Sequence, residues 1–149
     1  MPIVKKLEQH KLVLDTHVWI WLMNEDLNLS SNFLKAIDDA QKHDRILISA
    51  ISIWEIGMLV EKKRIELNTD CLDWVEKALA MPGVILTPIS PRIAIQSTRL
   101  AAVAHGDPAD RILITTAIEE NAVLITHDQK ILDYGINKFF SAYDPCLSG

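Results

Sequence analysis

The sequence predicts an α/β fold with three layers, in which a central parallel sheet of four to five strands has helices on both faces. Short apolar runs, typical of buried parallel strands, alternate along the chain with longer segments of helical periodicity. None of these runs is joined to the next by a hairpin turn signal. Consecutive strands are therefore expected to run in the same direction, with a helix packed between them.

Length and composition limit the class of protein. The 149 residues fit one domain, spanning 1–149, and 49% of them are hydrophobic, with only five Gly and six Pro, which argues against disorder. The longest apolar runs contain an acid and are far shorter than the roughly 20 residues that cross a bilayer. The N-terminal segment lacks the apolar core of a secretory signal, so we expect a cytoplasmic protein with no membrane partner.

The first elements follow from local sequence signals. A strand is expected at about 11–15 because its centre is the apolar run LVL, and the almost wholly apolar segment Thr16–Met23 follows as a short helix. A second helix is expected to begin near Ser30 or Ser31, since apolar residues then recur at helical spacing, and to end before Arg45.

The middle of the chain continues the alternation. The apolar run Ile46–Ile48 predicts the second strand, and the next helix is expected from Ser52 to about Lys63. Periodic apolar residues after a Thr-Asp capping pair predict a helix at Cys71–Ala80, which a Pro-Gly pair ends. Val84–Leu86 is the expected third strand.

The last third contains two Pro residues placed as first helical residues. Ser90 before Pro91 predicts a helix that runs toward His105, and Asp107 before Pro108 predicts another that runs to about Asn121. The remaining strands are expected at Ala122–Ile125 and Lys138–Phe140.

Asp15 is the only charged residue in the apolar stretch from Leu12 to Met23, and it stands where the first strand should end. That end of a parallel strand is where ligands bind in open α/β sheets. The alternative is that Asp15 caps the helix that follows, and both interpretations stay open here.

Glu55 is likewise the only charged residue between Ala50 and Val60, on a helix that is apolar nearly all round. The sequence Ser52-Ile53-Trp54-Glu55 matches a capping box, in which the Glu would bond the start of its own helix. A carboxylate near a buried helix N-terminus is also kept ionised by the helix dipole, so a second role is compatible with the first.

Two further acids occupy comparable positions. Asp110 lies three residues after the expected cap Asp107 and shares a helical face with apolar residues. Asp128 comes just past the fourth strand, where it could be an ordinary loop or cap residue.

Together, the four acids could meet at one edge of the sheet, where like charges repel unless a cation lies between them. Oxygen ligands suit Mg²⁺ or Mn²⁺, with one or two ions, and such a site suits phosphodiester hydrolysis.

Cys71 and Cys146 lack the spacing of a zinc motif and are expected to have no chemical role. The net charge of −5 argues against binding a nucleic acid by bulk electrostatics, so bound cations would have to help.

The segments LVLDTHVWIW, SIWEI, HGDPADRILITTA and LITHD, in this order, resemble the PIN-domain nucleases and in particular the VapC-type toxins of toxin-antitoxin pairs. The resemblance covers about residues 11–143. It implies a PIN-like fold and Mg²⁺- or Mn²⁺-dependent cleavage of RNA. It also implies a cognate antitoxin as partner and a homodimer or higher homo-oligomer. The implied catalytic and metal-binding residues are Asp15, Glu55, Asp110 and Asp128, with Thr16, Thr126 and Asp107 in support.

Residues with weaker signals could contact RNA. His17 and His127 lie close in sequence to the acids, and Arg111 follows Asp110 directly. The basic run 62–64 could also contact an RNA backbone, although solvated loop and helix-end residues explain all of these equally well.

The helix Thr16–Met23 suggests a protein partner. Trp19 and Trp21 should point in different directions, so that one sheet cannot bury both, and Trp is common at interaction surfaces. A chain that covers both tryptophans itself is the alternative.

Other classes fit less well. A haloacid dehalogenase-type phosphatase needs a second Asp where His17 stands, and a receiver domain needs an acid after the third strand. A dinucleotide-binding module needs a GxGxxG turn, which does not occur. An RNA-processing nuclease without a toxin role, or a non-catalytic PIN scaffold, stays open, and the target RNA is not specified.

Overall fold

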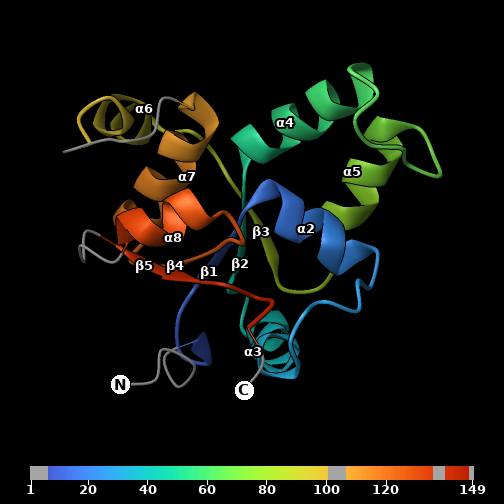
Figure 1. Ribbon diagram of the computed structural model, residues 1–149, viewed down its shortest axis with the longest axis horizontal. Helices are drawn as coiled ribbons and strands as arrows, with labels where there is room; N and C mark the ends of the chain where they lie inside the picture. The colour runs from blue at the N-terminus through green and yellow to red at the C-terminus, as the bar shows by residue number, and fades with distance from the viewer. Residues whose placement is uncertain (1–6, 101–106, 136–139, 148–149) are drawn as a thin grey trace.

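The computed structural model describes residues 7–100, 107–135 and 140–147. It contains a five-stranded sheet in the order β3-β2-β1-β4-β5, in which every neighbouring pair is parallel (Figure 1). The predicted parallel α/β class is therefore confirmed. The strands are β1 (Leu12–Leu14), β2 (Ile46–Ser49), β3 (Val84–Thr87), β4 (Val123–Ile125) and β5 (Ser141–Tyr143).

Helices cover both faces of the sheet, so that the fold has the three predicted layers (Figure 1). They are α2 (Thr16–Met23), α3 (Ser31–Lys42), α4 (Ala50–Glu61), α5 (Cys71–Leu79), α6 (Pro91–Ser97), α7 (Pro108–Glu119) and α8 (Gln129–Gly135).

The strand β1 shows how the two cores are divided. Leu12 and Leu14 belong to one core and Val13 to the other, because successive side chains of a strand point to opposite faces. The first core includes side chains of α2, α3, α4 and α5, and the second includes side chains of α7 and α8. Helix α6 packs on α7. A strand buried on both faces must be apolar throughout, which makes a carboxylate at its end conspicuous.

Most of the predicted helix starts are confirmed by their side-chain caps. In each case the cap side chain accepts a hydrogen bond from a backbone N–H in the first turn, which satisfies a group that the helix leaves unpaired. The caps are Ser30, Asp70, Ser90 and Asp107.

Some predicted boundaries are wrong. Helix α4 begins at Ala50, because Ser49 caps it by accepting a hydrogen bond from the Ile51 N–H over 3.1 Å, so the start at Ser52 is incorrect. Phe140 lies before β5, not within it, and the other residues of the predicted fifth strand are outside the described residues.

Two helices also differ from the prediction. Helix α6 ends at Ser97, and the continuation toward His105 falls partly on residues 101–106, which are not described. Helix α8 was not predicted, because its seven residues are too few to show an apolar period.

The chain covers the two tryptophans of α2 to different extents. Trp19 is 1% exposed and packs edge-on against Trp74, with 5.4 Å between ring centroids. Trp21 is half-buried, with its ring beside that of His127. The expectation that one of these tryptophans stays uncovered is therefore wrong for Trp19, whereas Trp21 keeps part of its surface exposed. Among the described residues no helix is both long and apolar enough to cross a membrane.

Candidate active site

The order of the strands places two loops beside each other at the carboxyl edge of the sheet. From β1 the chain moves to β2 and β3 on one side, whereas β4 and β5 lie on the other side, so the direction of winding reverses between β1 and β4. Ligands bind in the crevice that such a reversal creates. Asp15 follows β1 directly, and the segment Thr126–Asp128 follows β4.

Asp15 is buried, with 9% of its surface exposed, and its carboxylate is held from the neighbouring strand. Its Oδ2 accepts a hydrogen bond from the Thr126 hydroxyl over 2.7 Å. Asp15 does occupy the N-cap position of α2, but its side chain makes no capping hydrogen bond, so the interpretation as a simple cap is wrong. Burial raises the pKa of Asp15, and the Thr126 hydrogen bond opposes part of that rise.

Glu55 is held by α2 rather than by its own helix. The Thr16 hydroxyl donates a hydrogen bond to Glu55 and lies 2.9 Å from the Ser52 hydroxyl. Because a hydroxyl has one hydrogen to donate, we assign the chain of bonds as Ser52 to Thr16 to Glu55. The capping-box interpretation is therefore wrong: Ser49 is the cap, and Ser52 instead supports Thr16. Burial raises the pKa of Glu55, and the charges of Asp15 and Asp107 raise it further.

Asp110 lies in the first turn of α7, three residues after the cap Asp107, whose side chain accepts a hydrogen bond from the Ala109 N–H over 2.9 Å. Burial is the main reason that the pKa of Asp110 is raised to about 7. Nearby negative charges add to the rise, and they come from all of the other candidate acids: Asp107, Asp15, Asp128 and Glu55. Asp110 is therefore the acid that interacts electrostatically with all of the others.

Asp128 combines two roles. Its Oδ1 accepts hydrogen bonds from the backbone N–H groups of Lys130, over 2.8 Å, and Ile131, over 3.4 Å, which confirms the capping interpretation for the start of α8. Its own N–H donates to the Thr126 hydroxyl over 3.1 Å. Its charge also raises the pKa of both Asp15 and Asp110, so the cap faces the acid cluster.

The donor set of this cluster fits a hard divalent cation. Every candidate ligand is a carboxylate, and within the described residues no Lys or Arg is ion-paired with Asp15, Glu55 or Asp128. The cluster is loose, because no three of the acids in the described ranges bring carboxylate oxygens within 4.8 Å of one another. A cation would offset the repulsion that opposes closer approach.

A pocket of about 840 Å³ opens beside the cluster. Among its lining residues are His17, Glu55 and Asp107 from the candidate site. Trp54, 58% exposed on the same helix as Glu55, also lines it and was not singled out from the sequence. Lys62 and Arg64 lie along the same pocket, so part of the basic run is close to the acids.

The remaining candidates are placed less directly. The Nε of Arg111 donates to the Ser97 carbonyl over 3.1 Å, which ties α7 to α6. The Nδ1 of His127 lies 3.0 Å from the Asp144 Oδ1, within hydrogen-bond distance. His17 is exposed, and its electrostatic interaction lowers the pKa of both Asp15 and Glu55.

The family model of the PIN domain matches residues 12–137, which is most of the chain. The chain belongs to this family, as its motifs predicted. Among particular relatives, it is 34% identical over 120 residues to Ribonuclease VapC22 of Mycobacterium tuberculosis (strain ATCC 25618 / H37Rv), a match that covers 80% of this chain and 88% of that protein.

The fold also has a solved counterpart. A chain in the crystal structure of VapBC2 from Rickettsia felis, bound to a DNA fragment from their promoter, superimposes with a TM-score of 0.66. The match covers 89% of this chain and 97% of that chain, at 16% sequence identity. At that identity the likeness supports the fold alone.

Proposed function

We propose that this protein is a divalent-metal-dependent endoribonuclease that serves as the toxin of a toxin-antitoxin pair. The observation that carries the proposal is the placement of Asp15 and Asp128 at the carboxyl ends of neighbouring strands, with Glu55 held by a hydrogen bond from Thr16 next to Asp15. The raised pKa of Asp110, to about 7, agrees with its closeness to these acids. Unpaired like charges that lie close together oppose folding, and perturbed pKa values are concentrated at functional sites. The identity to a named ribonuclease supports the nuclease class.

Asp15, Glu55, Asp110 and Asp128 are the residues that would hold Mg²⁺ or Mn²⁺, as one or two ions. When bound, the metal would supply a Lewis acid that activates water and neutralises phosphate charge. The protein's own contribution is to orient these ligands. Thr126 fixes the carboxylate of Asp15, and Thr16 fixes that of Glu55. Such supporting hydrogen bonds set the direction in which a ligand presents its oxygen.

The pocket gives the substrate a place beside the acids. Trp54 offers an exposed aromatic face on which a base can stack, and Lys62 and Arg64 can neutralise backbone phosphates along the same wall. These contacts favour single-stranded RNA, whose bases are free to stack. They also compensate locally for the overall charge of −5.

The proposed partners are RNA, a cognate antitoxin and a second copy of this chain. The resemblance of its motifs to the VapC-type toxins of toxin-antitoxin pairs, together with the 34% identity to Ribonuclease VapC22, supports an antitoxin partner here. Toxicity on expression, relieved by co-expression of a small neighbouring gene, would support the toxin role. A harmless nuclease would favour RNA processing instead.

The direct test is cleavage of single-stranded RNA by purified protein with Mg²⁺ or Mn²⁺, and with EDTA. Asp15→Asn, Glu55→Gln and Asp110→Asn should each reduce the rate by orders of magnitude. Undiminished cleavage in EDTA would rule the mechanism out, and no cleavage by the metal-loaded wild type would favour the non-catalytic scaffold.

A matched control is available in α5. Asp73 lies three residues after the cap Asp70, as Asp110 lies three after Asp107, but it is exposed. Asp73→Asn should leave cleavage unchanged. Asp107→Asn should have a milder effect than Asp110→Asn, because Asn is also a good cap.

A further inference from the structure

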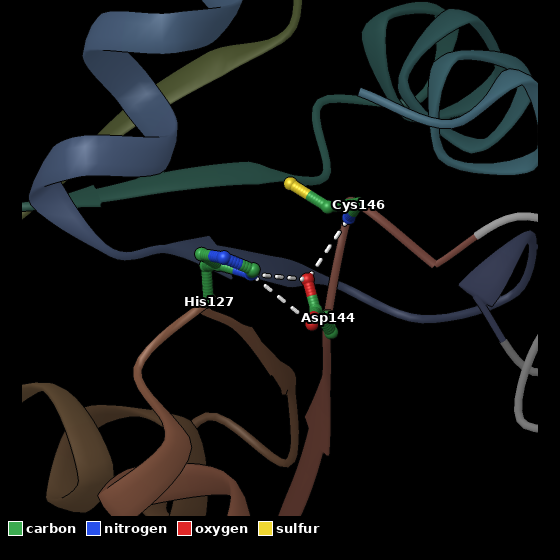
Figure 2. A group of neighbouring side chains, drawn as sticks. All are labelled: His127, Asp144 and Cys146. Carbon is green, nitrogen blue, oxygen red and sulfur yellow. Dashed lines mark hydrogen bonds and ion pairs between the residues drawn. The ribbon is translucent and has the colours of Figure 1, made fainter. Parts of the chain in front are cut away.

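A second group of side chains, apart from the acid cluster, brings three different metal-binding groups together. His127, Asp144 and Cys146 each offer one ligand atom within 4.8 Å of the other two, and no other His, Cys, Asp or Glu trio does so in the described part of the chain. Figure 2 shows the imidazole, the carboxylate and the thiol converging on one space.

The parallel pairing of two strands creates this group. Ile125 of β4 pairs with Tyr143 of β5, so the residues that follow the two strands run side by side. Asp144 connects them, since its Oδ1 accepts a hydrogen bond from the Cys146 N–H over 2.9 Å and lies 3.0 Å from the His127 Nδ1. The carboxylate thereby holds the His127 imidazole and the backbone of Cys146 close together before any ion arrives.

We propose that His127, Asp144 and Cys146 form a Zn²⁺ site, separate from the carboxylate cluster. An imidazole and a thiol are ligands that Zn²⁺ prefers and Mg²⁺ avoids. Tetrahedral zinc, with bonds of about 2.0 to 2.3 Å, holds its ligand atoms roughly 3.5 Å apart, so small side-chain rotations would close the observed group around an ion.

The surroundings leave room for a fourth ligand. His127 and Cys146 line a pocket of about 370 Å³ together with Trp21, Asp26 and Asn28. A water molecule can complete a tetrahedral shell there. The alternative is a plain hydrogen bond between His127 and Asp144, which gives the Cys146 thiol no role, so the reactivity of that thiol distinguishes the two interpretations.

The first test measures alkylation of the two cysteines by iodoacetamide, followed by peptide mass spectrometry, in metal-free buffer and with Zn²⁺. At ten times its dissociation constant, Zn²⁺ should slow modification of Cys146 about tenfold, because only the ion-free fraction reacts. Cys71, also partly exposed, is the internal control and should react at an unchanged rate. Equal rates at Cys146 with and without Zn²⁺ would overturn the proposal.

The second test uses Co²⁺ as a spectroscopic substitute in the full-length protein. A cobalt-thiolate charge-transfer band should appear in the wild type and in Cys71→Ser, and should be absent from Cys146→Ser. A band that persists in Cys146→Ser would overturn the assignment. His127→Gln should weaken Zn²⁺ binding by more than about 10- to 100-fold. Losses of about that size already follow when only a hydrogen bond that supports a ligand is removed.

The acid cluster provides the last control. Glu55→Gln and Asp110→Asn should retain both the cobalt band and the protection of Cys146, because neither residue belongs to the proposed zinc site. Loss of protection in these variants would place the ion at the carboxylates and overturn the proposal. These measurements need no RNA cleavage, so they stand or fall separately from the nuclease function.

Discussion

The Thr126 hydroxyl donates a hydrogen bond to the Asp15 carboxylate over 2.7 Å, between residues that are 111 positions apart in the sequence. The same hydroxyl accepts a hydrogen bond from the N–H of Asp128. One fully buried side chain therefore links the end of β1 to the end of β4 and fixes two candidate metal ligands at once. This relationship leads to the first prediction.

Thr126→Val should reduce metal-dependent RNA cleavage by about 10- to 100-fold, the usual effect of losing a group that orients a metal ligand. Thr126→Ser keeps the hydroxyl and should restore most of the activity. The reduction is expected in kcat rather than in KM, since Thr126 does not line the RNA pocket. Steady-state kinetics of both variants test this, and equal losses in Val and Ser would point to packing instead of the hydrogen bond.

The second prediction concerns pH. The pKa of Asp110 is raised from 3.8 to about 7 in the folded protein, so between these values the folded state binds more protons than the unfolded state. Stability of the metal-free protein should therefore fall as the pH rises from about 4 to about 7. For a half-exposed carboxylate the contribution, reduced by solvent screening, is on the order of 1–2 kcal/mol.

The comparison with Asp110→Asn isolates this effect, because the variant cannot titrate at that position. Denaturant unfolding in EDTA should give a stability difference that grows in favour of the variant from pH 4 to pH 7 and is constant above it. Asp73→Asn, at the equivalent position of α5, should show no such growth. A difference that is the same at all pH values would contradict the raised pKa.

A third prediction addresses the substrate pocket. Trp54→Ala should raise KM for single-stranded RNA by about 5- to 150-fold, because stacking of one base is worth about 1–3 kcal/mol. Trp54→Phe should keep most of the affinity. Thermal stability should change little, since the side chain is 58% exposed. Leu72→Ala, at a 63% exposed position on α5, is the control, and an equal effect there would argue against stacking.

The sequence singled out Asp15 and Glu55 as candidate site residues because their positions contradict the local apolar pattern. Asp15 interrupts an apolar strand-helix junction and Glu55 an apolar helix, and burial of charge needs a reason. The support of Glu55 could not be predicted: Ser52 matched a capping box, but Ser49 is a competing cap three residues earlier, and α2 supplies the Thr16 bond.

Contacts between residues that are distant in the sequence were the least predictable. His127 and Asp144 are 17 residues apart, and their contact follows from the pairing of β4 with β5, whose position was predicted incorrectly. Similarly, the burial of Trp19 was not predicted, because no local pattern shows that α5 brings Trp74 against it. Local patterns specify elements and outlying charges, whereas contacts between distant segments depend on strand order.

The last prediction uses the melting temperature to detect repulsion within the acid cluster. Asp110 has a pKa raised by burial and four other acids, so replacing its charge should stabilise the metal-free fold. In EDTA, Asp110→Asn is expected to melt at a higher temperature than the wild type, although it cleaves no RNA. Mg²⁺ should reverse this order, because the wild type binds the ion only when folded and gains about 2.7 kcal/mol at a hundredfold excess over the dissociation constant. The variant, which lacks one ligand, should gain much less.

Asp73→Asn loses only a favourable charge in the first turn of α5, so its melting temperature should fall slightly in EDTA and respond to Mg²⁺ as the wild type does. If Asp110→Asn instead melted lower than the wild type in EDTA, by the amount that Asp73→Asn does, Asp110 would be an ordinary first-turn acid and the cluster would not be a metal site.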